Sequence, residues 1–284
     1  MASNSAPSSS EYIVHHLGHL NTSGHPQKDI VDFSIVNIDT VFYSVVLGAL
    51  LCWILHKAAQ SVKADTAPNR FVGAIESLVE FVHEQARSIV HGDVRYIAPL
   101  ALLSFLWIVL MNAMDLLPVD LLPRLGELVG IPYMRVVPTA DLNAPLAMAI
   151  MVLGASIYYG IKIKSPAGFT KELFTAPFGT SSNPIFAAML GVVNFAMQII
   201  EYLAKTVSLG MRLFGNMFAG ELVFMLIALM GGAFAWTVTG SLLGFGHILA
   251  GTAWAIFHIL IVLLQGFIFM MLTLVYIGQA HEAH

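Results

Sequence analysis

Hydrophobic residues in this chain gather into long uninterrupted runs separated by short polar stretches. Each run is near or above the roughly 20 residues that a membrane-spanning helix needs. The runs cover Val41 to Leu55, Ile97 to Leu117, Leu142 to Ile161, Ile185 to Met230 and Ile248 to Ile277. The pattern therefore predicts an all-α polytopic membrane protein with about five membrane helices.

A different pattern fills the stretch from Phe71 to Val90. Apolar residues recur there at helical spacing, while acidic and basic residues occupy the other side of the same helix. The apolar positions are Phe71, Ile75, Leu78, Val82 and Ile89, and the charged ones are Glu76, Glu80, Glu84 and Arg87. This segment is typical of an amphipathic helix that lies in the membrane interface.

The distribution of Lys and Arg predicts which loops face the cytoplasm, because basic loops remain on that side. Basic residues are scarce before the first run, frequent after it, scarce after the second and frequent again after the third. We therefore expect an outer N-terminus and a cytoplasmic C-terminus. The polar N-terminal residues lack the features of a cleavable signal peptide.

These observations divide the chain into five parts. They are an outer-side N-terminal segment (1–37), a first membrane helix (38–57), an interfacial amphipathic helix (68–92), second and third membrane helices with connecting loops (97–184), and a helical hairpin (185–284).

Composition excludes several classes of protein. Of 284 residues, 57% are hydrophobic and only 11% are charged, whereas soluble domains carry about 25% charged residues. The net charge of −4 provides no basic surface, so we expect no nucleic-acid partner. The single cysteine, Cys52, excludes a disulfide framework and a multi-cysteine metal site. We expect no metal and no cofactor.

The last two hydrophobic runs are too long to stand upright in a bilayer. A helix from Ile185 to Met230 would be about 69 Å long and one from Ile248 to Ile277 about 45 Å, against a hydrocarbon core of roughly 30 Å. Ordinary tilt does not absorb the longer excess. We expect a strongly oblique hairpin; the alternative is that a glycine breaks the first run into two upright helices.

Polar residues within the run from Ile185 to Met230 line up on one helix face, within about 80° of one another. They are Asn194, Gln198, Glu201, Lys205, Ser208, Arg212 and Asn216. Glu221 lies on the opposite face from Arg212. A milder polar seam on the last run contains His247, Gly251, His258, Gln265 and Tyr276.

Arg212 is the most costly of these residues, at about 2.5 to 3.5 kcal/mol on insertion scales. Arginine does not deprotonate in proteins, so its charge needs an anionic or aqueous partner. Glu201 is about 16 Å away along the helix and is better placed to pair with Lys205, at i, i+4 spacing. We therefore expect the partner of Arg212 on another chain.

The other polar residues can be interpreted as either structural or functional. A structural pair is favoured for Glu201 with Lys205, and a solvated or fold-holding role is favoured for Asp115, Asp120 and Asp141. His258 alone is as compatible with a satisfied core histidine as with a functional one. Paired with Glu221 across a hairpin, it would favour a titratable relay.

Two functional classes are compared for a membrane protein with such polar residues. A secondary ion transporter or channel also retains intramembrane charges, although transporters usually show internal repeats and the halves of this chain are not self-similar. An intramembrane hydrolase is disfavoured because the chain has no H-E-x-x-H and no G-x-S-x-G. It has no P-loop either, which argues against ATP binding by this chain.

The run from Ser208 to Glu221, SLGMRLFGNMFAGE, followed by WAIFHILI at Trp254 to Ile261 and LQGF at Leu264 to Phe267, resembles subunit a of the rotary proton-translocating ATP synthases, in its bacterial form. Further matching motifs cover most of the chain. They are MNAMDLLP at Met111 to Pro118, RVVPTAD at Arg135 to Asp141 and GFTKEL at Gly168 to Leu173.

The resemblance implies a stator of the membrane sector that is not an enzyme on its own. By it, Arg212 is the essential arginine that faces the c-ring carboxylate, and Asn216 and Gln265 are its polar neighbours at the rotor contact. Glu221 and His258 match a pair that lines a proton half-channel, and Ser208 matches a position near the arginine.

The same resemblance implies a set of partners and a location. We expect the c-subunit ring, the b-subunit peripheral stalk, other ATP synthase subunits and lipid as partners, in the bacterial inner membrane. The apolar surroundings of Arg212 and the titratable His258 favour H⁺ over Na⁺ as the coupling ion.

One departure from the family pattern concerns the inner half-channel. Many bacterial relatives carry a Glu where this chain has Gln198, which cannot titrate. Glu201 restores a carboxylate on the same face, about one turn further along. We therefore include Glu201 among the candidate proton-translocation residues.

Overall fold

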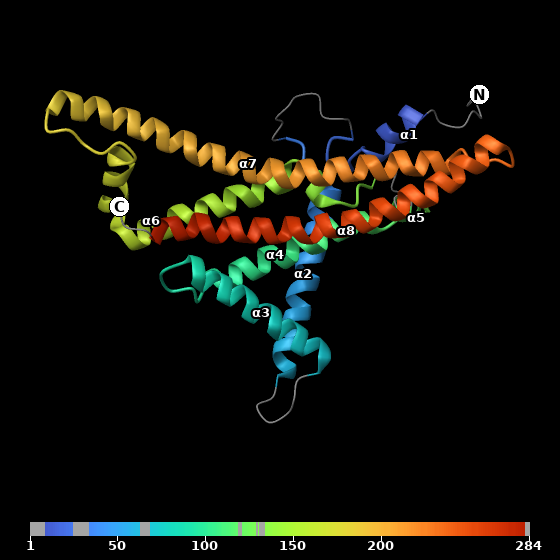
Figure 1. Ribbon diagram of the computed structural model, residues 1–284, viewed down its shortest axis with the longest axis horizontal. Coiled ribbons are helices and arrows are strands. Elements are labelled where there is room, and N and C mark those ends of the chain that lie inside the picture. The colour runs from blue at the N-terminus through green and yellow to red at the C-terminus, as the bar shows by residue number, and fades with distance from the viewer. Residues whose placement is uncertain are drawn as a thin grey trace. The chain divides into compact units, whose positions relative to one another are not determined.

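The computed structural model describes residues 9–24, 34–62, 69–118, 121–128, 130 and 134–281. Long helices dominate this part of the chain (Figure 1). Contacts divide it into two compact units. The first unit contains residues 1–54, 106–144 and 213–266, and the second contains 55–105, 145–212 and 267–284.

Five of the described helices are long and apolar enough to cross a membrane, which confirms the predicted number. They are α2 (Ile38–Ser61), α4 with its 3-10 continuation (Ile97–Leu116), α6 (Asn143–Thr175), α7 (Pro184–Gly232) and α8 (Val238–His281). Shorter or more polar helices are α1 (Ser9–His16), α3 (Arg70–Ile89) and α5 (Leu121–Leu128).

α6 and α8 each extend ten or more residues beyond one end of their hydrophobic runs. α6 continues to Thr175 across a kink at Ser165, where φ is 62°, and Pro166 follows directly. Proline fits the first turn of a new helix because it needs no N–H partner there. α8 begins at Val238, well before Ile248, because the intervening glycines and Ser241 lower the hydropathy without ending the helix.

The alternative in which a glycine breaks α7 is wrong. The helix runs without interruption from Pro184 to Gly232, 49 residues, and Figure 1 shows both α7 and α8 as continuous rods. At 1.5 Å per residue, α7 is about 74 Å long. A cost of about 1 kcal/mol per interior glycine is therefore not enough to end the helix.

In the first unit, polar contacts join α2 to the segments around α4 and the second 3-10 turn (Pro138–Ala140). The indole N–H of Trp107 donates to the backbone oxygen of Ser44 at 3.0 Å. The Asp141 carboxylate accepts hydrogen bonds from Asn37 and Thr40, which lie 104 and 101 positions earlier in the sequence. Asp141 is therefore fold-holding, as the sequence favoured.

The second unit has its own apolar core, which includes the amphipathic helix α3. Val82 and Ala86 of α3 are fully buried against Ile97 of α4 and against Met270 and Leu274 of α8. The predicted helix is confirmed, with a strongly amphipathic pattern, although Phe71 on its apolar side is exposed.

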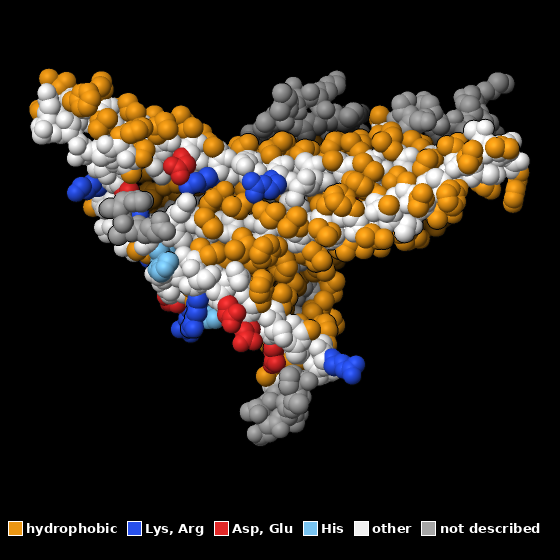
Figure 2. Space-filling view, viewed as in Figure 1, with side chains coloured by type: hydrophobic (Ala, Val, Ile, Leu, Met, Phe, Trp, Pro, Cys, Tyr) orange, Lys and Arg blue, Asp and Glu red, His pale blue; other side chains and the backbone are white. Residues whose placement is uncertain are grey.

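Large apolar side chains also cover much of the outer surface. Figure 2 shows hydrophobic residues over most of the visible surfaces of α7 and α8, and exposed examples include Val192, Leu203, Ile248 and Leu260. Soluble monomers rarely expose apolar patches of this extent. They fit a protein that has lipid or other membrane helices as its surroundings.

Candidate functional site

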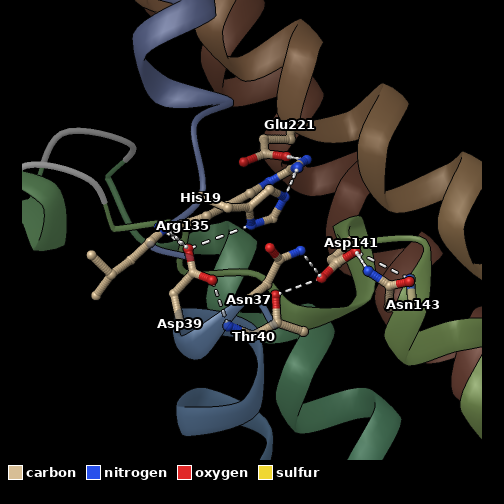
Figure 3. Close-up of polar contacts among 9 residues, drawn as sticks. His19, Asn37, Asp39, Thr40, Arg135, Asp141, Asn143 and Glu221 are labelled. Carbon is tan, nitrogen blue, oxygen red and sulfur yellow. Dashed lines mark hydrogen bonds and ion pairs between the residues drawn. The ribbon is translucent and has the colours of Figure 1, made fainter. Parts of the chain in front are cut away.

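A cluster of charged side chains is buried in the first unit, where it joins three distant parts of the sequence (Figure 3). Nη2 of Arg135 donates to Oε2 of Glu221 on α7 at 2.6 Å, and both side chains are at least nine-tenths buried. Nη1 of Arg135 lies 2.9 Å from Nε2 of His19. The guanidinium therefore bridges a carboxylate and an imidazole, as its planar set of donors allows.

Asp39 at the start of α2 completes this cluster. Its Oδ2 accepts hydrogen bonds from the backbone N–H groups of Leu20 and Arg135, at 3.1 and 3.2 Å. The same oxygen lies 3.4 Å from Nδ1 of His19. One buried carboxylate thus fixes the chain segments that carry the imidazole and the guanidinium.

A second buried pair, Asp115 with His258, lies in the same unit. Nε2 of His258 is 2.8 Å from Oδ2 of Asp115, and both side chains are almost completely shielded from solvent. Phe224 and Trp254 flank the imidazole, with ring centroids 5.2 and 6.1 Å away. A Cβ on Gly220 would overlap the imidazole ring, so a side chain at that position would displace it.

The first pair adjoins a small cavity of about 30 Å³. Asp115, Arg135 and Glu221 are among its lining residues, and His16 of α1 also contributes. A space of this size is large enough for a water molecule, which these charged side chains could hydrogen-bond. Side chains from both pairs therefore line one space that can hold a water molecule.

The structure gives Glu221 and His258 different partners from the expected ones. Glu221 pairs with Arg135, and His258 with Asp115, so the direct pairing of Glu221 with His258 is corrected to two neighbouring pairs. Asp115 is buried beside a histidine and is not a solvated loop residue. Asp120 lies outside the described residues.

Sequence reasoning missed four residues of this region as candidate site residues: His19, Asp39, Asp115 and Arg135. Asp39 and Asp115 had a usable signal, because an ionisable residue at the edge of an apolar run is a candidate for function, whereas Arg135 lies outside the apolar runs. His19 had none, since it stands in a polar segment that contains several histidines.

The second unit contains a large open cavity, of about 790 Å³, among α6, α7 and α8. Charged and polar side chains line much of it, including Lys164, Glu172, Glu201, Lys205 and Gln279. Nζ of Lys164 donates to Glu172 at 2.7 Å across the α6 kink. Water can therefore reach charged groups at the membrane-spanning helices.

The predicted pair of Glu201 with Lys205 is confirmed at an N to O distance of 2.5 Å. Lys205 also donates to Oε1 of Gln279 at 2.7 Å and lies over the Tyr276 ring. The Glu201 side chain is 51% exposed. Gln198 lines the same cavity, so the carboxylate and the amide share one space.

Ser208, Arg212 and Asn216 are exposed, one turn apart on α7, and Gln265 of α8 is buried. No ion pair joins Arg212 to another side chain within the described ranges. An acidic partner on another chain stays a prediction for Arg212.

Asn194 has a structural role instead of a place in the polar path. It is fully buried and accepts a hydrogen bond from the backbone N–H of Phe178 at 3.1 Å. Its amide donates to the carbonyl oxygens of Phe174 and Gly179. Asn194 therefore fixes the turn that follows α6.

Comparisons with known proteins identify the family of this chain. Residues 41–278 match the family model described as "ATP synthase A chain". The chain is 60% identical to ATP synthase subunit a of Acidovorax sp. (strain JS42), over 98% of each sequence. It is 58% identical to that of Paracidovorax citrulli (strain AAC00-1), again over 98% of each. The chain belongs to the ATP synthase A chain family.

Proposed function

We propose that this chain is the stator subunit a of the ATP synthase membrane sector. In that role it provides two proton half-channels and the arginine that couple H⁺ translocation to c-ring rotation and ATP synthesis. The observation that carries the proposal is Arg212, an exposed cation without an acidic partner among the described residues, on a continuous apolar helix between two polar regions. Family membership supports it.

The first half-channel uses the buried pairs of the first unit. Glu221 and His258 are its protonatable groups on α7 and α8, held by Arg135 and Asp115. Charged groups inside a membrane protein are costly unless paired, so their retention supports a role in proton movement. This half-channel opens to the outer side, where the N-terminus lies in the proposed topology.

The second half-channel uses the open cavity of the second unit. Its volume of about 790 Å³ and its charged lining support access for water from the cytoplasmic side. Glu201 supplies a carboxylate at which a departing proton can bind. Lys205 holds this carboxylate in place through the pair described above.

Arg212 separates the two paths along α7. Glu201 is eleven positions before it and Glu221 nine positions after it, so they lie about 16 and 14 Å away along the helix axis. A proton from the outer path neutralises a ring carboxylate, which then moves into lipid without the cost of a bare charge. Arg212 stabilises the ionised carboxylate that returns and repels a proton that would cross directly.

The partners follow from the exposed groups around Arg212. Ser208 and Asn216 lie on the same exposed stripe as Arg212. The small residues Gly215 and Ala219 are also exposed there and leave the stripe without large protruding side chains. This stripe faces the c-ring carboxylates, and Gln265 of α8 is a further polar residue, which is buried. The b-subunit stalk holds the stator in the bacterial inner membrane, with the C-terminus on the cytoplasmic side.

Replacement of Arg212 by Ala tests this function. We expect ATP synthesis to be abolished, because no fixed cation then favours the ionised ring carboxylate at the stator. The measurement is ATP synthesis by purified ATP synthase in liposomes under an imposed proton gradient. Lys162→Ala, at an exposed cation of α6, is the matched control. Normal synthesis by the Arg212 variant would refute the proposal.

A further inference from the structure

The N-terminal segment places a partly exposed imidazole against the buried charges of the first unit. His19 follows α1, and its side chain is 19% exposed, whereas that of Asp39 is only 2% exposed. Arg135 and Glu221 are also buried. Figure 3 shows the imidazole beside Asp39 and the Arg135 guanidinium. Among these four side chains, His19 is the one that solvent reaches most readily.

The backbone holds this segment against the start of α2. Thr22 N–H donates to the carbonyl of Val36 at 3.1 Å, and Ile38 N–H donates to that of Leu20 at 2.8 Å. Leu20 N–H also donates to the Asp39 carboxylate. The position of His19 is therefore fixed by main-chain hydrogen bonds on its C-terminal side, and not by the imidazole alone.

The geometry fixes the protonation state of each ring nitrogen of His19. Arginine has only donors, so Nε2, which lies 2.9 Å from Nη1 of Arg135, must be the acceptor. The ring is therefore neutral in this arrangement, with its hydrogen on Nδ1, the nitrogen that faces Asp39. A proton that binds at Nε2 must displace the hydrogen bond from Arg135.

Three charged side chains surround the imidazole. Asp39 from α2 and Glu221 from α7 are negative, and Arg135 from the segment before the second 3-10 turn is positive. The neutral imidazole leaves the group with one net negative charge, and an imidazolium would cancel it. His15 and His16 of α1 are the other histidines on the described part of this segment.

We propose that His19 is the proton-accepting residue at the outer end of the first half-channel, an inference that rests on the proposed function. Nε2 takes a proton from a hydronium ion, which leaves as water, and the hydrogen bond from Arg135 is released. The imidazolium then gives this proton to the Glu221 carboxylate, and Arg135 returns to Nε2. One proton moves inward, and the imidazole is neutral again.

The test is the pH dependence of ATP synthesis by the whole complex in liposomes. The pH of the compartment that faces His19 is varied from 5 to 8, while the membrane potential is adjusted to keep the total driving force constant. Histidine is the side chain that ordinarily changes charge in this range. The variant is His19→Gln, whose amide still accepts a hydrogen bond from Arg135 but does not titrate. His15→Gln, at an exposed histidine of α1, is the control.

We expect His19→Gln to slow synthesis about five- to tenfold at pH 8 and less than twofold at pH 5, where hydronium ions are plentiful. His15→Gln should follow the wild type. A His19→Gln profile that superimposes on the wild type, or that falls by one factor at every pH, overturns the proposal. So does a wild-type rate that does not change between pH 5 and 8, a result that needs no variant.

Chemical rescue adds a measurement that a structural role would not affect. In His19→Ala, small imidazoles and amines added on the outer side should restore synthesis, at rates that follow the basicity of the added base. Rescue that is independent of basicity would overturn the proposal. Arg212→Ala separates the two proposals, because it abolishes synthesis whatever the result at His19.

Discussion

The two polar regions of this protein differ in how far their charged side chains are exposed to solvent. In the first unit, Arg135 and Glu221 are buried and form a direct pair at 2.6 Å. In the second unit, the Lys205 and Glu201 pair lines an open cavity, and the Glu201 side chain is half exposed. The same chemistry, a cation beside a carboxylate, is thus found once with little solvent and once with much of it.

This difference determines what each pair contributes. Removal of one partner from a buried pair leaves a charge with neither water nor counter-ion, which costs about 3 to 5 kcal/mol. An exposed pair contributes about 0 to 1 kcal/mol, because water replaces the lost partner. We therefore expect a substitution in the buried pair to change both stability and proton movement. A substitution in the cavity pair should change proton movement with little effect on stability.

The largest effect is expected for Arg135→Met. It leaves Glu221 buried without its partner, and it also removes the donor to His19. We expect the free energy of unfolding to fall by about 3 to 5 kcal/mol. The measurement is the amount of the subunit in assembled complexes, together with the unfolding temperature of the complex in detergent.

A double variant shows how much of this loss arises from the unpaired carboxylate. Arg135→Met with Glu221→Gln removes both charges, and we expect assembly to recover while ATP synthesis stays at least tenfold below wild type. Assembly that does not recover would mean that Arg135 acts mainly through other contacts, such as its approach to the Phe218 ring at 5.6 Å.

A smaller effect is expected for Gly220→Ala. The new Cβ would overlap the His258 ring, so the imidazole must move away from Asp115 and the 2.8 Å contact is lost. We expect ATP synthesis to fall about tenfold, which corresponds to about 1.4 kcal/mol in the barrier. Gly154→Ala on α6 is the control, because a Cβ there meets no described atom within 4 Å. Equal rates for the two variants would contradict this reading.

The sequence predicted the helices well because the hydrophobic pattern is strong where lipid surrounds the protein. α2, α4 and α7 begin within a few residues of their hydrophobic runs. The start of α8 was missed because hydropathy measures apolar character, whereas a helix also tolerates glycine and serine. The kink at Ser165 was missed because Pro166 stands in a polar stretch after the apolar run.

The candidate site was only partly predictable from the sequence. Intramembrane residues such as Arg212, Glu221 and His258 are conspicuous because an apolar environment penalises charge. Their partners are not, because the pairing of Glu221 with Arg135 spans 86 positions and that of Asn37 with Asp141 spans 104. Periodicity describes one helix at a time, so it does not show which helices approach each other.

The smallest effect on stability, and the sharpest contrast with Arg135, is expected for Glu201→Gln. The glutamine retains a hydrogen-bond acceptor for Lys205 but carries no charge, so we expect the free energy of unfolding to change by less than about 1 kcal/mol. ATP synthesis should nevertheless fall severalfold, because Gln198 in the same cavity cannot bind the departing proton. The double variant Gln198→Glu with Glu201→Gln moves the carboxylate about one turn along α7, and we expect it to recover much of the rate. Unchanged synthesis by Glu201→Gln, measured in the same liposomes, would reduce Glu201 to a structural partner of Lys205.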